Sequence, residues 1–317
     1  MAYDEPFADP SALPTYAVAE AAGRHLKVVL NGEGADELFA GYRRHLAVLY
    51  FSRWERAFRL PAGALRPMMG FLPAPTGFRT PYAFFYRFVR GLGESPMGRY
   101  IVWSSDGFTE VEKRALYRPE DGVFPATADA LSRDLSWLGG RGVVGDFMAV
   151  DFALSMGDCL LVKMDIATMA HGLEARCPFL DHRLAEWAAG LPRRVLFAGR
   201  TNKPLLRALA RRYLPDAVAS APKRGFEIPL IQWVRRDLFA MISDLCLSPN
   251  GIVREIFEKR QIEGLLLRRD GLDEERWAKR LWILLMLALW DRLCRRYTAP
   301  AGMAAQPPAT AEATRGS

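Results

Sequence analysis

The sequence has few cysteines, no long hydrophobic run and no dense run of basic residues. Its four cysteines are scattered and form no C-x-x-C pair, which argues against a zinc site or a disulfide framework and fits a reducing cytoplasm. No apolar segment opens the chain, and its longest apolar run, residues 281–290, is shorter than the roughly 20 residues that span a bilayer. We therefore expect no membrane segment and interpret residues 281–290 as a buried helix.

Charge and composition narrow the class of protein further. With 317 residues, half of them apolar and a quarter charged, the chain is long enough for one large or two smaller globular domains. The net charge of +7 raises the question of a nucleic-acid partner. No basic run is interleaved with aromatics as a nucleic-acid groove requires, and the aromatic-rich residues 76–104 are better explained as a helical core face. We therefore expect a solvated basic surface and no nucleic-acid partner.

The most informative stretch is residues 26–42, which has the pattern of a strand, a glycine-rich turn and a helix. Residues 28–30 fit a strand buried on both faces. Gly32 and Gly34 allow unusual backbone angles and close approach of a ligand. Asp36 and Glu37 fall in the first helical turn, where the helix dipole favours negative charge. This arrangement is typical of an anion site such as one for phosphate.

Three carboxylates, those of Glu33, Asp36 and Glu37, crowd that turn and would repel a phosphate. A Mg²⁺ ion between the carboxylates and the phosphate oxygens would remove this repulsion, because Mg²⁺ is commonly held by one or two carboxylates plus phosphates. The alternative is two acidic residues that cap a helix and an unrelated loop glutamate. A helix over residues 16–24, then the strand and the second helix, form a piece of a doubly wound α/β sheet.

Two later blocks carry further polar residues. In residues 151–192, Lys163 lies on a helix, Arg176 precedes a proline and is expected in an extended loop, and Asp181 can cap a helix that starts at Arg183. In the next block Lys203 directly precedes Pro204, which fits the first position of a helix. A lysine there is unfavourable for the helix dipole unless an anion is bound; the alternative is an ordinary exposed lysine.

Taken together, these blocks resemble the synthetase domain of glutamine-dependent asparagine synthetases, over roughly residues 3–295. Three motifs occur in the family's order. They are NGEGADELFAGY at residues 31–42, MAHGLEARCPFLD at 169–181, and TNKPLLR at 201–207 with KRGF at 223–226. The resemblance implies an ATP-pyrophosphatase type of α/β fold. It also implies that ATP activates the carboxylate of aspartate as an acyl-adenylate, from which ammonia derived from glutamine displaces AMP.

The resemblance also assigns roles to particular residues. Asn31 and Gly32 stand where the family contacts ATP through the backbone, and Asp36 matches an aspartate that binds Mg²⁺ and pyrophosphate. Glu33 matches a glutamate linked to forming and consuming the adenylate, with a base role toward ammonia. Lys203 matches a lysine that meets the phosphates. Arg176 and Asp181 match positions that we expect to support the site structurally.

The chain also departs from the family pattern. The Ser-Gly-Gly-x-Asp-Ser pyrophosphate loop that should precede residues 31–42 is absent, as is the glutaminase domain with its cysteine nucleophile. We therefore expect a truncated α/β domain over residues 1–297, mostly helical with a short remnant of parallel sheet, followed by a disordered tail over 298–317. We also expect that this chain alone does not make an amide.

Two alternatives to an asparagine-forming enzyme stay open. Relatives of the family amidate polysaccharides or peptides, so the carboxylate substrate could be one of these. The chain could instead be a non-catalytic partner that docks on a separately encoded N-terminal half through an exposed sheet edge.

Overall fold

The computed structural model describes most of the chain, and all structural statements below refer to the residues it describes. These are residues 3–54, 75, 80–92, 94–105, 107–118, 126–137, 139–198, 201–221, 225–226, 228–268 and 272–298. The proline-punctuated residues 55–72, Lys223 and Arg224 of the third motif, and the predicted tail beyond residue 298 lie outside the described residues.

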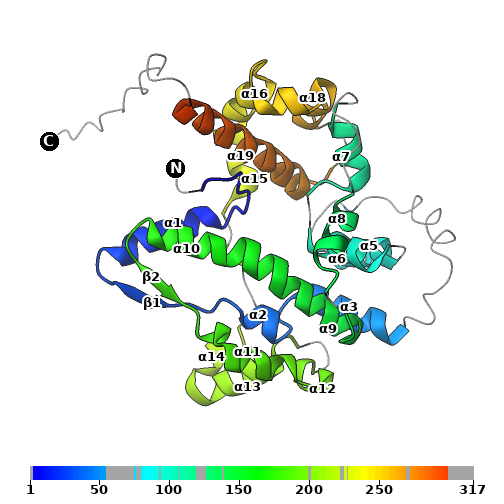
Figure 1. Ribbon diagram of the computed structural model, residues 1–317, viewed down its shortest axis with the longest axis vertical. Coiled ribbons are helices and arrows are strands. Elements are labelled where there is room, and N and C mark those ends of the chain that lie inside the picture. Colours follow the sequence, from blue (N-terminus) through cyan, green and yellow to red (C-terminus); the bar gives the residue numbers. More distant parts are fainter. Residues whose placement is uncertain are drawn as a thin grey trace.

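The described chain is mostly helical, with one short sheet (Figure 1). The elements up to residue 169 are α1 Ala12–Gly23, β1 Val28–Leu30, α2 Ala35–Leu38, α3 Arg43–Trp54, α5 Pro81–Leu92, α6 Pro96–Ser104, α7 Glu110–Leu116, α8 Thr127–Asp134, α9 Gly142–Val150, η2 Asp151–Leu161 and α10 Val162–Met169. Those that follow are β2 Glu174–Arg176, η3 Pro178–Leu180, α11 His182–Ala189, α12 Arg193–Leu196, α13 Pro204–Tyr213, α14 Asp216–Ala219, α15 Leu230–Gln232, η4 Trp233–Asp237, α16 Phe239–Leu247, α17 Ile252–Ile256, α18 Lys259–Leu266 and α19 Glu274–Thr298.

A single helical rod formed by α9, η2 and α10 crosses the centre of the molecule (Figure 1). Its 142–169 segment contains no proline, so nothing interrupts the main-chain hydrogen bonds. The middle of the rod, η2, is a π-helix of 11 residues. Such wider turns are rare and often occur at functional sites. The rod connects the region around α3 and α6 to the sheet, because α9 contacts α3 and α10 contacts β2.

The sheet consists of β1 and β2, which run parallel and pair Val28 with Glu174 and Leu30 with Arg176. This confirms the short parallel remnant. The prediction that β1 is buried on both faces is wrong, because Val28 is 41% exposed and Leu30 is 72% exposed. Val28 and Leu30 point to the same face of the sheet and are left uncovered there. Among the described residues no strand pairs with the outer edge of β1.

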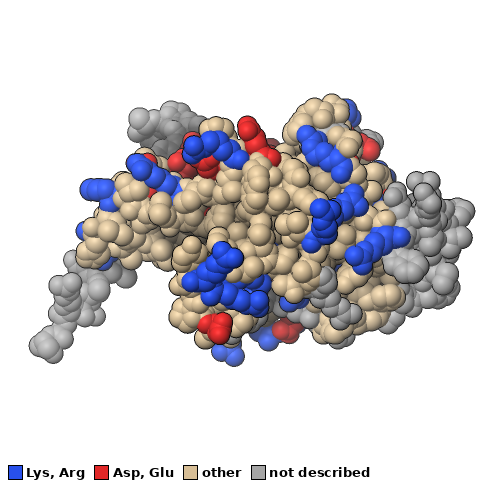
Figure 2. Space-filling view, turned by 90° about the horizontal axis from the view of Figure 1, so that it is seen from below, with Lys and Arg blue, Asp and Glu red and all other residues tan. Residues whose placement is uncertain are grey.

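Two main clusters of buried side chains hold the helices together. One surrounds α19, whose Leu281, Leu284 and Leu285 are almost fully buried, as predicted for residues 281–290. The other joins α3, α6 and α9 and contains Tyr100 and Trp103, which confirms a core role for part of the aromatic-rich segment. None of the described helices combines the length and the apolar character that crossing a membrane requires. Figure 2 shows basic side chains in separate groups on one face, without a continuous stripe.

Candidate functional site

The loop between β1 and α2 is held in place by a glycine at its turn. Gly34 has a φ of +92°, and a Cβ at this position would lie 2.4 Å from Leu180 Cδ2. Any other residue would therefore be strained and would collide with η3. Gly32, in contrast, has open space where a Cβ would be. The loop thus packs closely against η3 at Gly34 and presents its backbone to the outside at Gly32.

The central contact of the site joins two distant motifs. Lys203 Nζ lies 2.8 Å from Asp36 Oδ1, and both side chains are largely shielded from solvent. Asn202 Nδ2 donates a hydrogen bond to the Gly41 carbonyl, which is 161 residues away in sequence, at 2.6 Å. A Cβ on Gly41 would lie only 1.7 Å from Asp36 Oδ1, so glycine at this position leaves room for the carboxylate.

The start of α13 explains how a lysine is accepted there. Lys203 is the N-cap residue with Pro204 directly after it, as predicted, and it adopts a left-handed conformation with a φ of 54°. The sequence indicated that a lysine at this place needs an anion nearby. In the structure that anion is the Asp36 carboxylate, which offsets the unfavourable interaction with the helix dipole.

Glu37 does not join the other carboxylates of the turn. Its side chain is buried and accepts a hydrogen bond from the Tyr42 hydroxyl. Burial raises the pKa of Glu37 above its usual value, although the hydrogen bond from Tyr42 acts in the opposite direction. The prediction that three carboxylates gather at the turn is therefore wrong: α2 directs Glu37 into the core, while Glu33 and Asp36 remain partly exposed.

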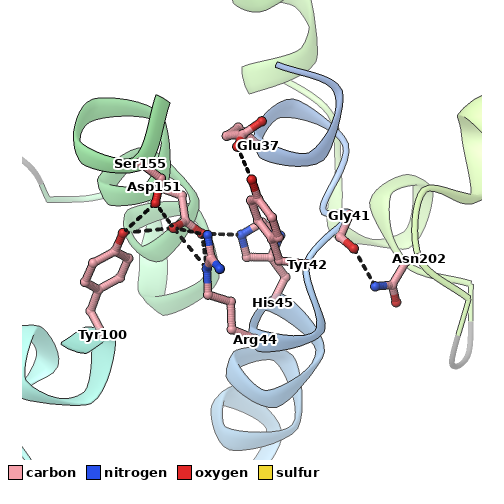
Figure 3. A network of polar contacts seen from close by, with 9 residues as sticks. All are labelled: Glu37, Gly41, Tyr42, Arg44, His45, Tyr100, Asp151, Ser155 and Asn202. Carbon is pink, nitrogen blue, oxygen red and sulfur yellow. Dashed lines mark hydrogen bonds and ion pairs between the residues drawn. The ribbon is translucent and has the colours of Figure 1, made fainter. Parts of the chain in front are cut away.

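A buried network behind α2 and α3 was not found from the sequence (Figure 3). Asp151, at the start of η2, accepts hydrogen bonds from Arg44 through Nε and Nη2 and from the Tyr100 hydroxyl at 2.9 Å. The His45 Nε2 atom lies 2.6 Å from Asp151 Oδ2. Burial alone would raise the pKa of Asp151, but His45 and Arg44 hold it below its usual value, so the carboxylate is charged. The network ties α3 and α6 to the central rod.

The remaining loop residues lie around the open side of the turn. The Glu33 backbone N–H donates to Asn31 Oδ1 at 3.1 Å, while Asn31 Nδ2 is buried and has no acceptor among the described residues. Burial, together with the carboxylates of Asp9 and Glu33, raises the pKa of the Cys159 thiol to about 11. The thiol is therefore mostly protonated at neutral pH, and the thiolate is the form that acts as a nucleophile.

Three other residues that the sequence singled out lie on separate elements. Lys163 is buried and contacts Ser11 Oγ at 3.0 Å and Asp9 Oδ2 at 3.4 Å, so it anchors the segment before α1. Arg176 is in β2, not in a loop, although its backbone is extended as predicted. The Asp181 side chain caps α11 by accepting from the Arg183 N–H, which confirms the predicted cap.

The site therefore brings together one lysine, one carboxylate and an open glycine at the carboxyl end of a parallel strand pair. Such an end is where α/β folds bind ligands. No group of three histidine, cysteine or acidic side chains that could cage a metal occurs within the described part of the chain. The donor set suits a ligand that carries its own oxygen donors better than a bare metal ion.

The fold and this loop define a helical protein built around a parallel strand pair, with an acid–lysine site at the strands' carboxyl end. The family model for asparagine synthase matches residues 1–292, so the chain belongs to the asparagine synthase family.

The chain is similar to curated relatives that carry this family's name. It is 29% identical over 304 residues to asparagine synthetase [glutamine-hydrolyzing] 1 of Bacillus subtilis, which covers 92% of this chain and 44% of that protein. It is 32% identical over 295 residues to a putative asparagine synthetase of Mycobacterium tuberculosis, which covers 92% of this chain and 43% of that protein. The chain thus spans less than half the length of these relatives. No solved structure matches it.

Proposed function

We propose that the chain carries one side of the active site of an ATP-dependent ligase that converts a carboxylate, aspartate foremost, into an amide. A carboxylate oxygen of the substrate attacks the α-phosphorus of ATP, and the bond to pyrophosphate breaks. Ammonia, supplied from glutamine, then attacks the carbonyl carbon of the adenylate, and AMP leaves. The observation that supports this most is the Asp36–Lys203 pair beside the open backbone at Gly32, because these groups come from two separate motifs of the family.

The residues of the loop suit the binding of phosphate groups. Lys203 supplies a positive charge that stabilises the negative charge built up on the phosphates in the transition state. Asn31 offers a buried donor, Nδ2, that has no acceptor among the described residues, and an ATP oxygen would satisfy it. Gly32 lets a ligand approach the main chain because no side chain covers it. The ATP-pyrophosphatase type of fold is part of this proposal.

Glu33 and Asp36 have separate proposed roles, in proton transfer and in Mg²⁺ binding. Glu33 lies on the same loop and is partly exposed, so its carboxylate can take a proton from the attacking ammonia. Asp36 would hold Mg²⁺ together with phosphate oxygens, since one carboxylate plus phosphates is a common ligand set for this ion. When bound, Mg²⁺ neutralises charge on the phosphates and makes pyrophosphate a better leaving group. Lys203, now paired with Asp36, would then face the phosphates directly.

The exposed outer edge of β1 favours a role for a second polypeptide segment. No strand pairs with this edge among the described residues, and Leu26, Val28 and Leu30, which alternate along the chain and so share one face of the sheet, are apolar and exposed beside it. An unpaired strand edge with apolar side chains is a template for another strand. We propose that a separately encoded N-terminal half supplies that strand and the pyrophosphate loop, and that the reaction takes place in the cytoplasm, where the four free cysteines stay reduced.

The carboxylate substrate is the least constrained part of the proposal. A match of 27% identity over 118 residues links the chain to amidase chry2 of Gibberella zeae, which is named for amide chemistry and not for asparagine. A polysaccharide or peptide carboxylate, as relatives of the family amidate, is the second candidate that we propose.

The proposal is tested by the binding of Mg²⁺–ATP to the purified chain in a calorimeter. We expect binding that is about a hundredfold weaker in Lys203→Ala, because a preorganised charge facing phosphate is lost. Arg133→Ala, an exposed arginine on α8, is the control and should bind like the wild type. Equal ATP affinity for Lys203→Ala and wild type would contradict the proposed site.

Activity gives a second measurement. The purified chain should catalyse no aspartate-dependent ATP–pyrophosphate exchange, and exchange should appear when the N-terminal half of a relative is copurified with it. Strong exchange by the chain alone would show that the two-part site is the wrong description.

A further inference from the structure

The chain that follows α2 turns back tightly on the residue that pairs with Lys203. The Gly41 N–H donates to the Asp36 carbonyl at 2.8 Å, and a Cβ on Gly41 would also meet the Asp36 Cα at 2.8 Å. Ala40, just before it, is fully buried and has a φ of 55°, which non-glycine residues rarely adopt. Backbone in such a region persists only where the surroundings hold it. The contacts that close this turn therefore also help to set the direction of the Asp36 side chain.

Tyr42 closes the turn through its side chain. Its hydroxyl donates a hydrogen bond to Glu37 Oε1, five residues earlier in the chain (Figure 3). Glu37 directly follows Asp36 on α2. Burial and the Glu37 carboxylate raise the pKa of Tyr42, so the hydroxyl keeps its proton and stays a donor at neutral pH. This bond fixes the far end of the turn to the helix that carries Asp36.

The ring of Tyr42 is held in turn by the buried network. The guanidinium of Arg44 lies over the ring, with its Cζ atom 3.7 Å from the ring centroid. The His45 ring meets it edge to face, with the two centroids 5.4 Å apart. Asp151 of the central rod contacts both of these side chains (Figure 3). Tyr42 thus connects the rod to the turn, with its ring on the network and its hydroxyl on α2.

We infer that Tyr42 is a positioning residue of the proposed ATP site. Through its hydrogen bond to Glu37 it holds α2 and the turn so that the Asp36 carboxylate faces Lys203. The inference rests on the proposed function for the identity of the ligand, whereas the contact between Asp36 and Lys203 is present without a ligand. Tyr42 acts on the ligand only through Asp36 and takes no part in the chemistry.

A double-mutant cycle of Asp36→Asn and Lys203→Met in the full chain, measured by urea unfolding, reports the coupling energy of that pair. In a Tyr42→Phe background we expect the coupling to fall by more than about half, because α2 is no longer tied to the ring. Phenylalanine keeps the ring under Arg44, so the fold is retained. The matched control is Tyr100→Phe, which removes a hydroxyl that donates to Asp151 at 2.9 Å and should leave the coupling unchanged.

Calorimetry with Mg²⁺–ATP gives a second readout on the same variants. Affinity should be about tenfold weaker in Tyr42→Phe and unchanged in Tyr100→Phe, since only the first hydroxyl holds the helix of Asp36. Glu37→Gln keeps an oxygen acceptor for the Tyr42 hydroxyl and should retain both the coupling and the affinity. Glu37→Met removes the acceptor and should behave like Tyr42→Phe, and combining the two changes should weaken neither measure further.

The outcomes separate the positioning role from the proposed function. Full coupling in the Tyr42→Phe background would overturn the inference, whatever the affinity for ATP. Equal loss of coupling with Tyr42→Phe and Tyr100→Phe would also overturn it, because the stability of the network alone would then matter. Loss of coupling with Tyr42→Phe alone supports the inference. If in that case the wild type bound no ATP, the positioning role would stand and the proposed ATP site would be refuted.

Discussion

Replacing Asp151 by asparagine removes the negative charge at the centre of the network in Figure 3 while keeping the shape of the side chain. Asp151 is fully buried, and the Arg44 side chain that pairs with it is only 16% exposed. Removing one partner of a buried ion pair leaves the other charge uncompensated, which typically costs about 3–5 kcal/mol. Because Arg44 keeps some contact with solvent, we expect the lower end, about 3 kcal/mol.

The loss can be measured by urea unfolding followed by tryptophan fluorescence. Asp158→Asn is the matched control, since it makes the same change on an exposed residue of the same π-helix and should alter stability by less than about 0.5 kcal/mol. The lowered pKa of Asp151 means that its contribution is complete above the usual carboxylate range and is lost as the pH falls below it. The difference in free energy of unfolding between wild type and Asp151→Asn should therefore persist from pH 7 to about 4 and become smaller in more acid solution.

A double-mutant cycle with Arg44→Met isolates the pair. The losses of unfolding free energy in the two single variants should not be additive, because each variant removes the same interaction. We expect a coupling energy of about 1–3 kcal/mol. Additive effects would refute the reasoning, as would a loss for Asp151→Asn no larger than that for Asp158→Asn.

Two further predictions concern the loop itself. Gly41→Ala should weaken ATP binding and lower stability, because its Cβ would displace the Asp36 carboxylate. Gly32→Ala should weaken ATP binding but leave the free energy of unfolding within about 0.5 kcal/mol of wild type. Calorimetry and urea unfolding of both variants test this, and a stability loss in Gly32→Ala would contradict the open position of that glycine. Because the pKa of buried Glu37 is raised, its contribution to stability is complete below the unfolded pKa and is lost as the pH rises through the folded pKa. Wild type should accordingly lose stability relative to Glu37→Gln as the pH rises above the usual carboxylate range. A difference in unfolding free energy between the two that does not change with pH would count against the burial of a titrating carboxylate.

Local signals in the sequence predicted the parts of the fold that depend on neighbouring residues. The strand at residues 28–30, the acidic first turn of α2, the cap at Asp181 and the proline after Lys203 all follow from backbone preferences over a few positions. The three motifs also pointed to the loop and to Lys203 before any contact between them was known.

Contacts between distant segments could not be predicted in this way. Asp151 and Arg44 are 107 residues apart, and neither stands in a pattern that marks a buried pair. Glu37 points inward, where the Tyr42 hydroxyl donates a hydrogen bond to it. The spacing of residues in a helical turn does not predict which acidic side chain will be buried against such a donor. The exposure of Val28 and Leu30 likewise depends on what packs over that face of the sheet, which is a property of the whole fold and not of the strand.

The left-handed backbone at Lys203 has a consequence for how this family member can be engineered. A non-glycine residue in that region is held there at a cost of order 1 kcal/mol or more, and the surroundings must compensate for it. Glycine or asparagine at position 203 would relieve the strain but would remove the ion pair with Asp36. Selection for thermal stability alone would weigh these two opposing effects and not ligand binding, so a library built on this chain needs a binding readout at every round.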